Sequence, residues 1–258
     1  MNRLLPLVLL TLLAVLAIPQ NSPLRPGPHP DGGYLLVTGW RVAPAGIQVP
    51  LPDTQPMNLV MHPDGKSLFV LNAGYTPPSV IIMSTADPKQ AARVSLDDAW
   101  MGLAMNKAGD RFYVPEGNLG TVREFSYARG QVKPLREFRL FSIDTTKKGR
   151  DRLPRTDYLS DATLWADGKW LFVANLQANL VHAIDLEKGD TSRKFPVGRH
   201  PYRLLATADR LYASNWGGES ITVVSLAAGP EMGKVRATVQ TGPHPTDMLL
   251  HGGRLYVA

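Results

Sequence analysis

The sequence PMNLVMHPDGKSLFVLN, which begins at Pro56, sets the pattern for most of the chain. It joins a short apolar strand to an alternating strand through a turn rich in Asp, Gly and Lys. Related stretches recur four more times. They begin at Trp100, Leu159, Pro201 and Pro245, which gives spacings of 44, 59, 42 and 44 residues. The body of the chain is therefore a repeat.

Each of the first four copies is followed by two more strand-like stretches. The first of these begin at Ser79, Thr121, Leu180 and Ile221, and the second at Ala92, Arg136, Ser192 and Arg236. Four short antiparallel strands in about 40–45 residues is the period of a propeller blade. We predict an all-β fold, a β-propeller of four-stranded antiparallel blades, over 34–258. The blades lie at about 56–98, 99–158, 159–199 and 200–243, with a partial blade at 244–258.

The N-terminus is typical of an export signal. Arg3 precedes an apolar run from Leu4 to Ile18, and small residues follow. The run is shorter than the roughly 20 apolar residues of a spanning helix, although an uncleaved anchor is the alternative. We predict a signal peptide at 1–22, a Pro-rich linker at 23–33, and an exported, periplasmic or extracellular protein with no stable membrane anchor after cleavage.

Two features at the ends of the repeat concern how the ring of propeller blades would close. GIQVPL, from Gly46, resembles the closing strand of a blade, so we expect it to pair with strands from the C-terminus. The fifth copy stops within a strand at Ala258. We therefore expect the chain to be a C-terminally truncated piece of a longer protein. The alternative is a five-bladed ring in which Tyr34–Trp40 and Gly46–Leu51 complete the last blade.

The charge is concentrated in one segment. The chain carries a formal charge of +6, and the segment from Arg123 to Arg155 alone has ten basic and four acidic residues. The rest of the chain has no net charge. This argues against a nucleic-acid partner, because the affinity of a protein for nucleic acid grows with the number of phosphates that it neutralises. The absence of Cys excludes disulfides, thiolate ligands and covalently attached haem.

Parts of the repeat resemble a known family. HPDGKSLFVLN at His62, ADGKWLFVANLQANLVHAIDLEKGD at Ala166 and FPVGRHPYRL at Phe195 are similar to the repeat of YVTN-type β-propellers. LLVTGWRVAPAGIQVPL at Leu35 and NAGYTPPSV at Asn72 resemble a subgroup in which an exported propeller precedes a phosphoesterase domain related to alkaline phosphatases. The resemblance implies seven blades in the intact protein, of which about four and a half are present here. That phosphoesterase domain is absent from this chain, so none of its site residues carries over.

The candidate ligand site is the mouth of the central channel. The first residues of the innermost strands face such a channel, and propellers commonly bind ligands there. A His-Pro pair precedes two of these strands. The alternative is that these pairs only shape the turn between blades. Charged residues in a channel wall can likewise be present without binding a ligand. The candidates are Asn58, Asp161, His200, Arg203, His244 and Asp247.

A second candidate is the loop near 142–158, where the long second repeat carries its extra residues. Insertions in repeat rings often lie on the binding face, and Arg matches phosphate with two parallel hydrogen bonds. An anionic ligand or a partner domain could bind there. The alternative is a solvated loop with no specific role. The cations are Lys147, Lys148, Arg150, Arg152 and Arg155.

Other recurring residues have structural explanations. One Asn closes the second strand in three copies, where it tolerates left-handed backbone and bonds its own turn. Four Trp residues are expected to pack between blades. The residues are Asn72, Asn175 and Asn215, and Trp100, Trp165, Trp170 and Trp216.

No catalytic motif for nucleotide, metal or acyl-transfer chemistry is present, and the six His have no ligand spacing. We expect no cofactor and no metal. The residues indicate a non-catalytic binding or docking platform for the appended phosphoesterase domain, with the propeller face as the contact. The alternative is a lactonase-type hydrolase with its site in the channel, built from Asp161, Arg203 and His200.

Overall fold

The computed structural model describes residues 25–258 apart from 47, 52–54, 75 and 89–90. The predicted signal peptide at 1–22 lies outside these residues. The chain divides into two units, Met1–Pro50 and Leu51–Ala258. In the first unit, β1 (Gly27–Pro28), β2 (Tyr34–Leu35) and β3 (Arg41–Val42) form a small antiparallel sheet in chain order.

The three N-terminal strands pair with one another. β2 lies between β1 and β3, and residues 48–51 form no strand. Arg41 pairs with Asp31, which tightens this local sheet. Because the connecting loops are short, this local pairing costs little conformational entropy. The closing strand predicted at Gly46–Leu51 is thus not among the strands of the described residues.

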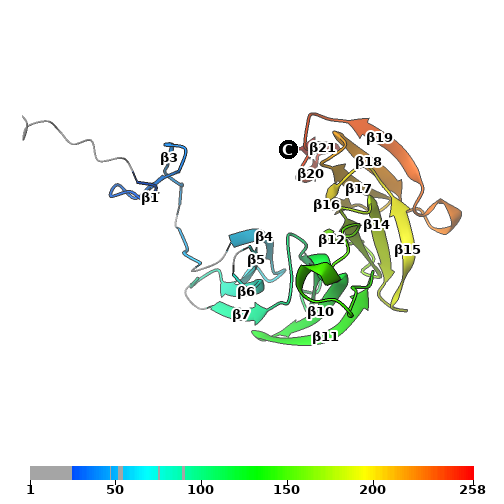
Figure 1. Ribbon diagram of the computed structural model, residues 1–258, viewed down its shortest axis with the longest axis horizontal. Helices are drawn as coiled ribbons and strands as arrows, with labels where there is room; N and C mark the ends of the chain where they lie inside the picture. The colour runs from blue at the N-terminus through cyan, green and yellow to red at the C-terminus, as the bar shows by residue number, and fades with distance from the viewer. Residues whose placement is uncertain (1–24, 47, 52–54, 75, 89–90) are drawn as a thin grey trace, which may run out of the picture. The chain divides into compact units, whose positions relative to one another are not determined.

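The second unit consists of antiparallel sheets that follow one another in chain order (Figure 1). The first four have four strands each, which confirms the predicted β-propeller blades, and the last has two. The first sheet holds β4 (Gln55–Met61), β5 (Ser67–Ala73), β6 (Ser79–Ser84) and β7 (Ala91–Ser95). The second holds β8 (Ala104–Met105), β9 (Arg111–Glu116), β10 (Thr121–Ala128) and β11 (Gln131–Arg139).

The remaining sheets repeat this arrangement. The third holds β12 (Leu159–Leu164), β13 (Trp170–Asn175), β14 (Leu180–Asp185) and β15 (Asp190–Pro196). The fourth holds β16 (Pro201–Ala206), β17 (Arg210–Asn215), β18 (Ser220–Ser225) and β19 (Val235–Gln240), and the last holds β20 (Met248–His251) and β21 (Arg254–Val257). The helical elements are the short turns η1 (Gly117–Leu119), η2 (Gly149–Arg152) and η3 (Gly229–Glu231). Among the described residues, no helix is long and apolar enough to cross a bilayer.

The Asp-Gly turns between first and second strands follow from their residues. Gly65 and Gly168 have φ of 68° and 72°, a conformation that glycine adopts without strain. The preceding Asp caps each turn, since Asp167 Oδ1 accepts the backbone N–H of Lys169 at 2.9 Å. These turns reverse the chain tightly enough for the two strands to pair.

The core lies between neighbouring sheets. Phe69 and Phe112 join the first and second sheets, and their rings lie 5.3 Å apart. Similar clusters join the second sheet to the third around Leu171, and the third to the fourth around Phe172. Each of these side chains is fully buried, so packing of blade on blade supplies most of the apolar burial that stabilises the unit.

The first strand of the second blade is shorter than its sequence predicts. Ala104 and Met105 alone form β8, although the repeat begins at Trp100. The partner strand β9 carries Pro115, which has no N–H to donate. A Cβ on Gly102 would lie 2.7 Å from the Pro115 ring. Pro115 therefore ends the ladder early, and Gly102 makes the close approach possible.

The recurring Asn residues are structural, but only one of the two predicted reasons holds. Asn175 Oδ1 accepts the N–H groups of Tyr158 at 3.0 Å and Ala178 at 3.2 Å, so it does bond its own turn. Asn72, Asn175 and Asn215 are nevertheless buried residues at or next to the ends of their strands, and none is left-handed. The left-handed position in this turn belongs to Asn179, with φ of 57°.

Candidate functional site

One face of the second unit collects the connections between blades. In the third blade, Leu159 pairs with Asn175, Asn175 with Leu180, and Leu180 with Pro196. The start of the first strand and the end of the fourth therefore lie at the same end of the sheet. We call this the connection face; it comprises the linking segments 140–158 and 197–200 and the turns 117–120, 176–179 and 216–219.

Three charged candidates from the sequence lie together at the start of the first strands. Arg203 Nη1 lies 3.3 Å from Asp161 Oδ1, and Arg203 Nε lies 3.9 Å from Asp247 Oδ1. Asp161 Oδ2 also accepts the backbone N–H of Leu204 at 2.9 Å. A chain of ion pairs thus runs across three successive blades.

Backbone irregularities occur at these positions in three blades. The register shifts between Pro56 and Asn58 in β4, between Leu159 and Ala162 in β12, and between Pro201 and Leu204 in β16. Bulges of this kind redirect a side chain out of the regular alternation. They explain how charged residues fit at the start of otherwise apolar strands.

Burial changes the chemistry of Asp161. Its side chain is 5% exposed, whereas that of Asp247 is 71% exposed. Burial raises the pKa of Asp161 to about 6, even though Arg203 and the Leu204 N–H favour its charged form. Asp161 is therefore the carboxyl of this chain of ion pairs that is suited to exchange a proton near neutral pH.

Asn58 serves the packing of neighbouring blades. Its Nδ2 donates to the carbonyl oxygen of Met101, in the next blade, at 2.7 Å. Ser160, which the sequence did not single out, makes a matching contact, because its Oγ donates to the carbonyl oxygen of Pro201 at 2.9 Å. Both side chains therefore join a first strand to the next blade across a blade boundary.

The two His-Pro pairs adopt the same backbone conformation. His200 and His244 have φ of 52° and 56° and so occupy the left-handed region. Trp216 lies near both rings, with centroids 6.5 Å from His200 and 4.4 Å from His244. This favours the turn-shaping alternative over direct ligand binding for these two residues.

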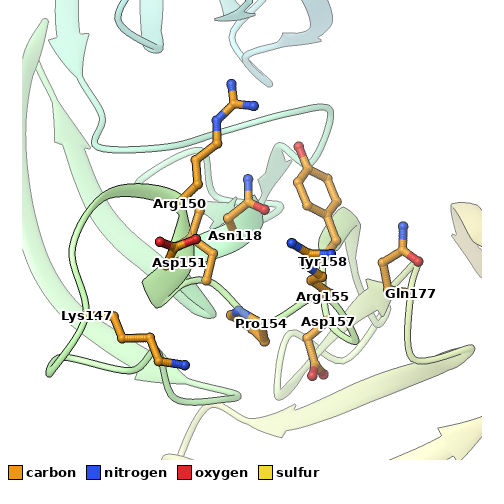
Figure 2. A pocket seen from close by; sticks show the side chains of 10 residues that line it. Asn118, Lys147, Arg150, Asp151, Pro154, Arg155, Asp157, Tyr158 and Gln177 are labelled. Atoms are coloured by element: carbon orange, nitrogen blue, oxygen red, sulfur yellow. The ribbon is translucent and has the colours of Figure 1, made fainter.

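The basic loop forms the wall of a cavity of about 910 Å³ on the connection face (Figure 2). Lys147, Arg150 and Arg155 come from the loop itself. Asn118 and Gln177 come from the turns of the second and third blades. The sequence predicted the loop, and the structure adds the turns that face it. The remaining lining residues are Asp151, Leu153, Pro154, Asp157 and Tyr158.

The charges on this wall are unevenly compensated. Lys147 Nζ lies 3.3 Å from Asp144 Oδ2. Within the described part of the chain, neither Arg150 nor Arg155 forms an ion pair within 4.0 Å. The carboxylates of Asp151 and Asp157 also line this wall, and Asp157 accepts a hydrogen bond from Asn175 Nδ2 at 2.8 Å. Two guanidinium groups therefore remain available to an anion.

The other two loop cations lie elsewhere. Lys148 is exposed and precedes η2. Arg152 lines a separate cavity of about 480 Å³, together with Glu116, Arg123 and Arg139. The five loop cations therefore do not all line the same cavity.

An aromatic group connects the cavity to the first strands, and sequence reasoning missed it. The Trp100 ring lies 5.3 Å from Tyr158 and 5.3 Å from Tyr202. Tyr158 also lines the cavity. Burial and the nearby Asp98 raise the pKa of Tyr158, so it stays a neutral donor. The available signal was an aromatic residue at or just before the first strand in three consecutive copies.

A buried polar group lies behind the cavity. Asn175 Nδ2, which donates to Asp157, also lies 3.3 Å from His182 Nε2. Burial and the nearby Lys194 lower the pKa of His182 to about 4, so the imidazole is neutral. In the described residues, no group of three or more His, Asp or Glu side chains could hold a metal ion.

The four-stranded antiparallel blades, packed in series with a polar connection face, define a β-propeller. No family model and no curated protein matches the sequence. Solved structures do match its fold.

Many solved structures share the fold, and three of them illustrate it. They are Kuenenia stuttgartiensis hydrazine synthase (18% identity, TM-score 0.58), a periplasmic gluconolactonase of Pseudomonas aeruginosa (18%, 0.59) and virginiamycin B lyase from Staphylococcus aureus (14%, 0.59). The matches cover 79%, 79% and 88% of this chain, and 54%, 57% and 69% of theirs. The chain thus spans little more than half the length of the first two.

Proposed function

We propose that this chain is an exported β-propeller module that binds without catalysis and serves as a docking platform for an appended phosphoesterase domain. The connection face is the contact surface, and its loop cavity takes a phosphate ester. The observation that carries the proposal is the pair of guanidinium groups of Arg150 and Arg155, which line the cavity and have no ion-pair partner among the residues that the structure describes.

The chemistry of the cavity supports a phosphate-bearing ligand. A guanidinium presents two parallel N–H donors, which fit phosphate oxygens. Asn118 and Gln177 can add neutral hydrogen bonds from the neighbouring turns. No group in the cavity has the arrangement of a nucleophile and base, so binding without turnover is the expectation. The choice of a phosphoesterase as the partner rests on the YVTN-type resemblance.

A titration with p-nitrophenyl phosphate tests this proposal, because one assay reports both binding and hydrolysis. We expect saturable binding with no release of p-nitrophenolate. Replacement of Lys147, Arg150 and Arg155 by Ser should weaken binding by at least about tenfold, since charge-assisted hydrogen bonds are lost. Arg129→Ser, in an exposed turn of the second blade, is the matched control. Equal affinity in the triple variant and the control would overturn the proposal.

A second candidate function is a lactonase-type hydrolase. It is favoured by the raised pKa of Asp161, about 6, and by the contact of this carboxyl with Arg203. The similar fold of a periplasmic gluconolactonase adds to this. Two observations count against it. Both carboxylate oxygens of Asp161 are already bonded, and the backbone conformation of His200 points to a turn role.

Turnover of gluconolactone separates the two candidates. The hydrolase requires measurable lactone opening that Asp161→Asn abolishes and that the loop triple variant leaves intact. The docking platform requires no opening above the rate in buffer. An active chain whose activity survives Asp161→Asn would contradict the hydrolase as assigned here.

A further inference from the structure

A second cavity, of about 690 Å³, lies between the second and third blades at the opposite ends of their strands from the connection face. Its walls include the turn at 106–108 of the second blade and the turn at 165–168 of the third. Arg111, Tyr113, Glu124 and Arg136 line its second-blade side. These come from β9, β10 and β11.

Glu124 is the fixed centre of this cavity. Its side chain is 1% exposed. It accepts hydrogen bonds from Arg111 Nη1 at 2.8 Å and Tyr113 OH at 3.0 Å, and from Arg136 Nε. A buried carboxylate needs such partners, because an unpaired charge is costly to bury. The two arginines are therefore held in place before any ligand arrives.

Both arginines keep donors free. Arg136 Nη2 donates to the carbonyl oxygen of Leu186 at 2.6 Å, and its guanidinium lies 4.6 Å from the centroid of the Phe138 ring. In the described residues, Arg136 Nη1 and the Nε and Nη2 of Arg111 have no partner. The two side chains are 41% and 45% exposed. Two positive charges thus share one carboxylate, which leaves an excess of one.

Two arginines contact Glu124, although one is enough to join the second blade to the third. Arg136 alone reaches the third blade, through Leu186. Among the described residues, no hydrogen bond or ion pair joins Arg111 to the third blade, yet Arg111 adds a second cation to a carboxylate that Arg136 and Tyr113 already satisfy. That second cation is explained by an anion that both guanidinium groups bind.

We propose that this cavity is a separate binding site for a small oxyanion, a carboxylate or a phosphate, held between Arg111 and Arg136. Lys107 adds a third cation to the wall. The acids Asp167 and Glu187 also line it. Each has a partner in Lys169, since Asp167 accepts its N–H at 2.9 Å and Glu187 lies 3.2 Å from its Nζ. They restrict the site to a small anion.

Isothermal titration with inorganic phosphate, and separately with succinate, tests the site. The full chain carrying Ser at Lys147, Arg150 and Arg155 serves as background, so that the loop cavity does not contribute. We expect saturable binding of at least one probe. Arg111→Gln should weaken it by about tenfold or more while the urea midpoint stays close to that of the background, because Arg136 still pairs with Glu124.

Two further variants make the result decisive. Arg210→Gln is the matched control, because Arg210 also opens the second strand of its blade and is similarly exposed, and it should not change binding. Glu124→Gln removes the competing negative charge, so it should tighten binding about threefold or more even as it lowers stability. The proposal is overturned if neither probe binds, or if Arg111→Gln and Arg210→Gln bind the probe equally. Weaker binding in Glu124→Gln with a native fold would also overturn it.

Discussion

Arg203 of the fourth blade lies 3.3 Å from Asp161 of the third, and the same guanidinium lies 3.9 Å from Asp247 beyond it. The side chain of Asp161 is buried while that of Asp247 is exposed. Arg203 therefore has one partner of fixed geometry and one that solvent screens. Its contact with Asp161 joins the first strands of two blades and favours the charged form of that carboxyl, against the burial that raises its pKa.

Asp161 should make stability depend on pH in a particular direction. Burial raises its pKa from 3.8 to about 6 in the folded chain. The folded state then binds more protons between these values, so the contribution of Asp161 is complete below pH 3.8 and is lost as pH rises through 6. The free energy of unfolding of the wild type minus that of Asp161→Asn should fall by about 3 kcal/mol between pH 3.5 and 7. Urea unfolding at several pH values measures this, and parallel curves would contradict it.

His182 should act with the opposite sign. Burial lowers its pKa from 6.5 to about 4, so the folded chain binds fewer protons than the unfolded chain in that interval. Stability should be lost as pH falls from 6.5 through 4, by up to about 3 kcal/mol. His182→Gln keeps a polar side chain without the titration and should flatten this part of the profile. If the variant loses the same stability as the wild type when pH falls from 6.5 through 4, other groups cause that loss.

The variant Ser160→Ala tests how much a hydrogen bond between blades contributes to stability. The buried Oγ of Ser160 donates to the Pro201 carbonyl, and alanine would leave that acceptor without its partner. We expect Ser160→Ala to lower the free energy of unfolding by about 1–2 kcal/mol. Ser126→Ala is the control, because Ser126 Oγ makes only a 3.4 Å contact at a less buried site. A cost no larger than that of the control would contradict this role.

The left-handed backbone of His200 predicts which substitutions it tolerates. Asn adopts this conformation readily, whereas a β-branched residue does not. We expect His200→Asn to be nearly neutral and His200→Val to cost about 1–2 kcal/mol in urea unfolding. Equal costs for the two variants would mean that the ring, and not the backbone, determines the effect.

The repeat made the fold predictable because each blade is encoded locally. The strands predicted at Ser79, Leu180 and Ile221 begin in the structure at Ser79, Leu180 and Ser220, the last of them one residue away. The exception in the second blade comes from Pro115 in β9, whose missing N–H shortens the neighbouring strand β8. A periodic pattern does not register such an effect.

The candidate sites were less predictable, because they depend on which turns meet in space. The repeat position of Asp161, Arg203 and Asp247 indicated that they would lie in adjacent blades, and the structure brings them together. The loop cavity needed Asn118 and Gln177 from two other turns, and neither belongs to a motif. The Glu124 cavity joins three strands of one blade to turns of the next, which no single stretch of sequence reveals.

Hydrogen exchange with and without p-nitrophenyl phosphate tests the proposed docking face most directly. The amides to follow are those of the loop 142–158 and of the turns 117–120 and 176–179, which line the cavity. The account predicts slower exchange in these three segments when the ligand is bound, and no such slowing in the variant with Ser at Lys147, Arg150 and Arg155. Saturable binding with unchanged exchange in all three segments would contradict it.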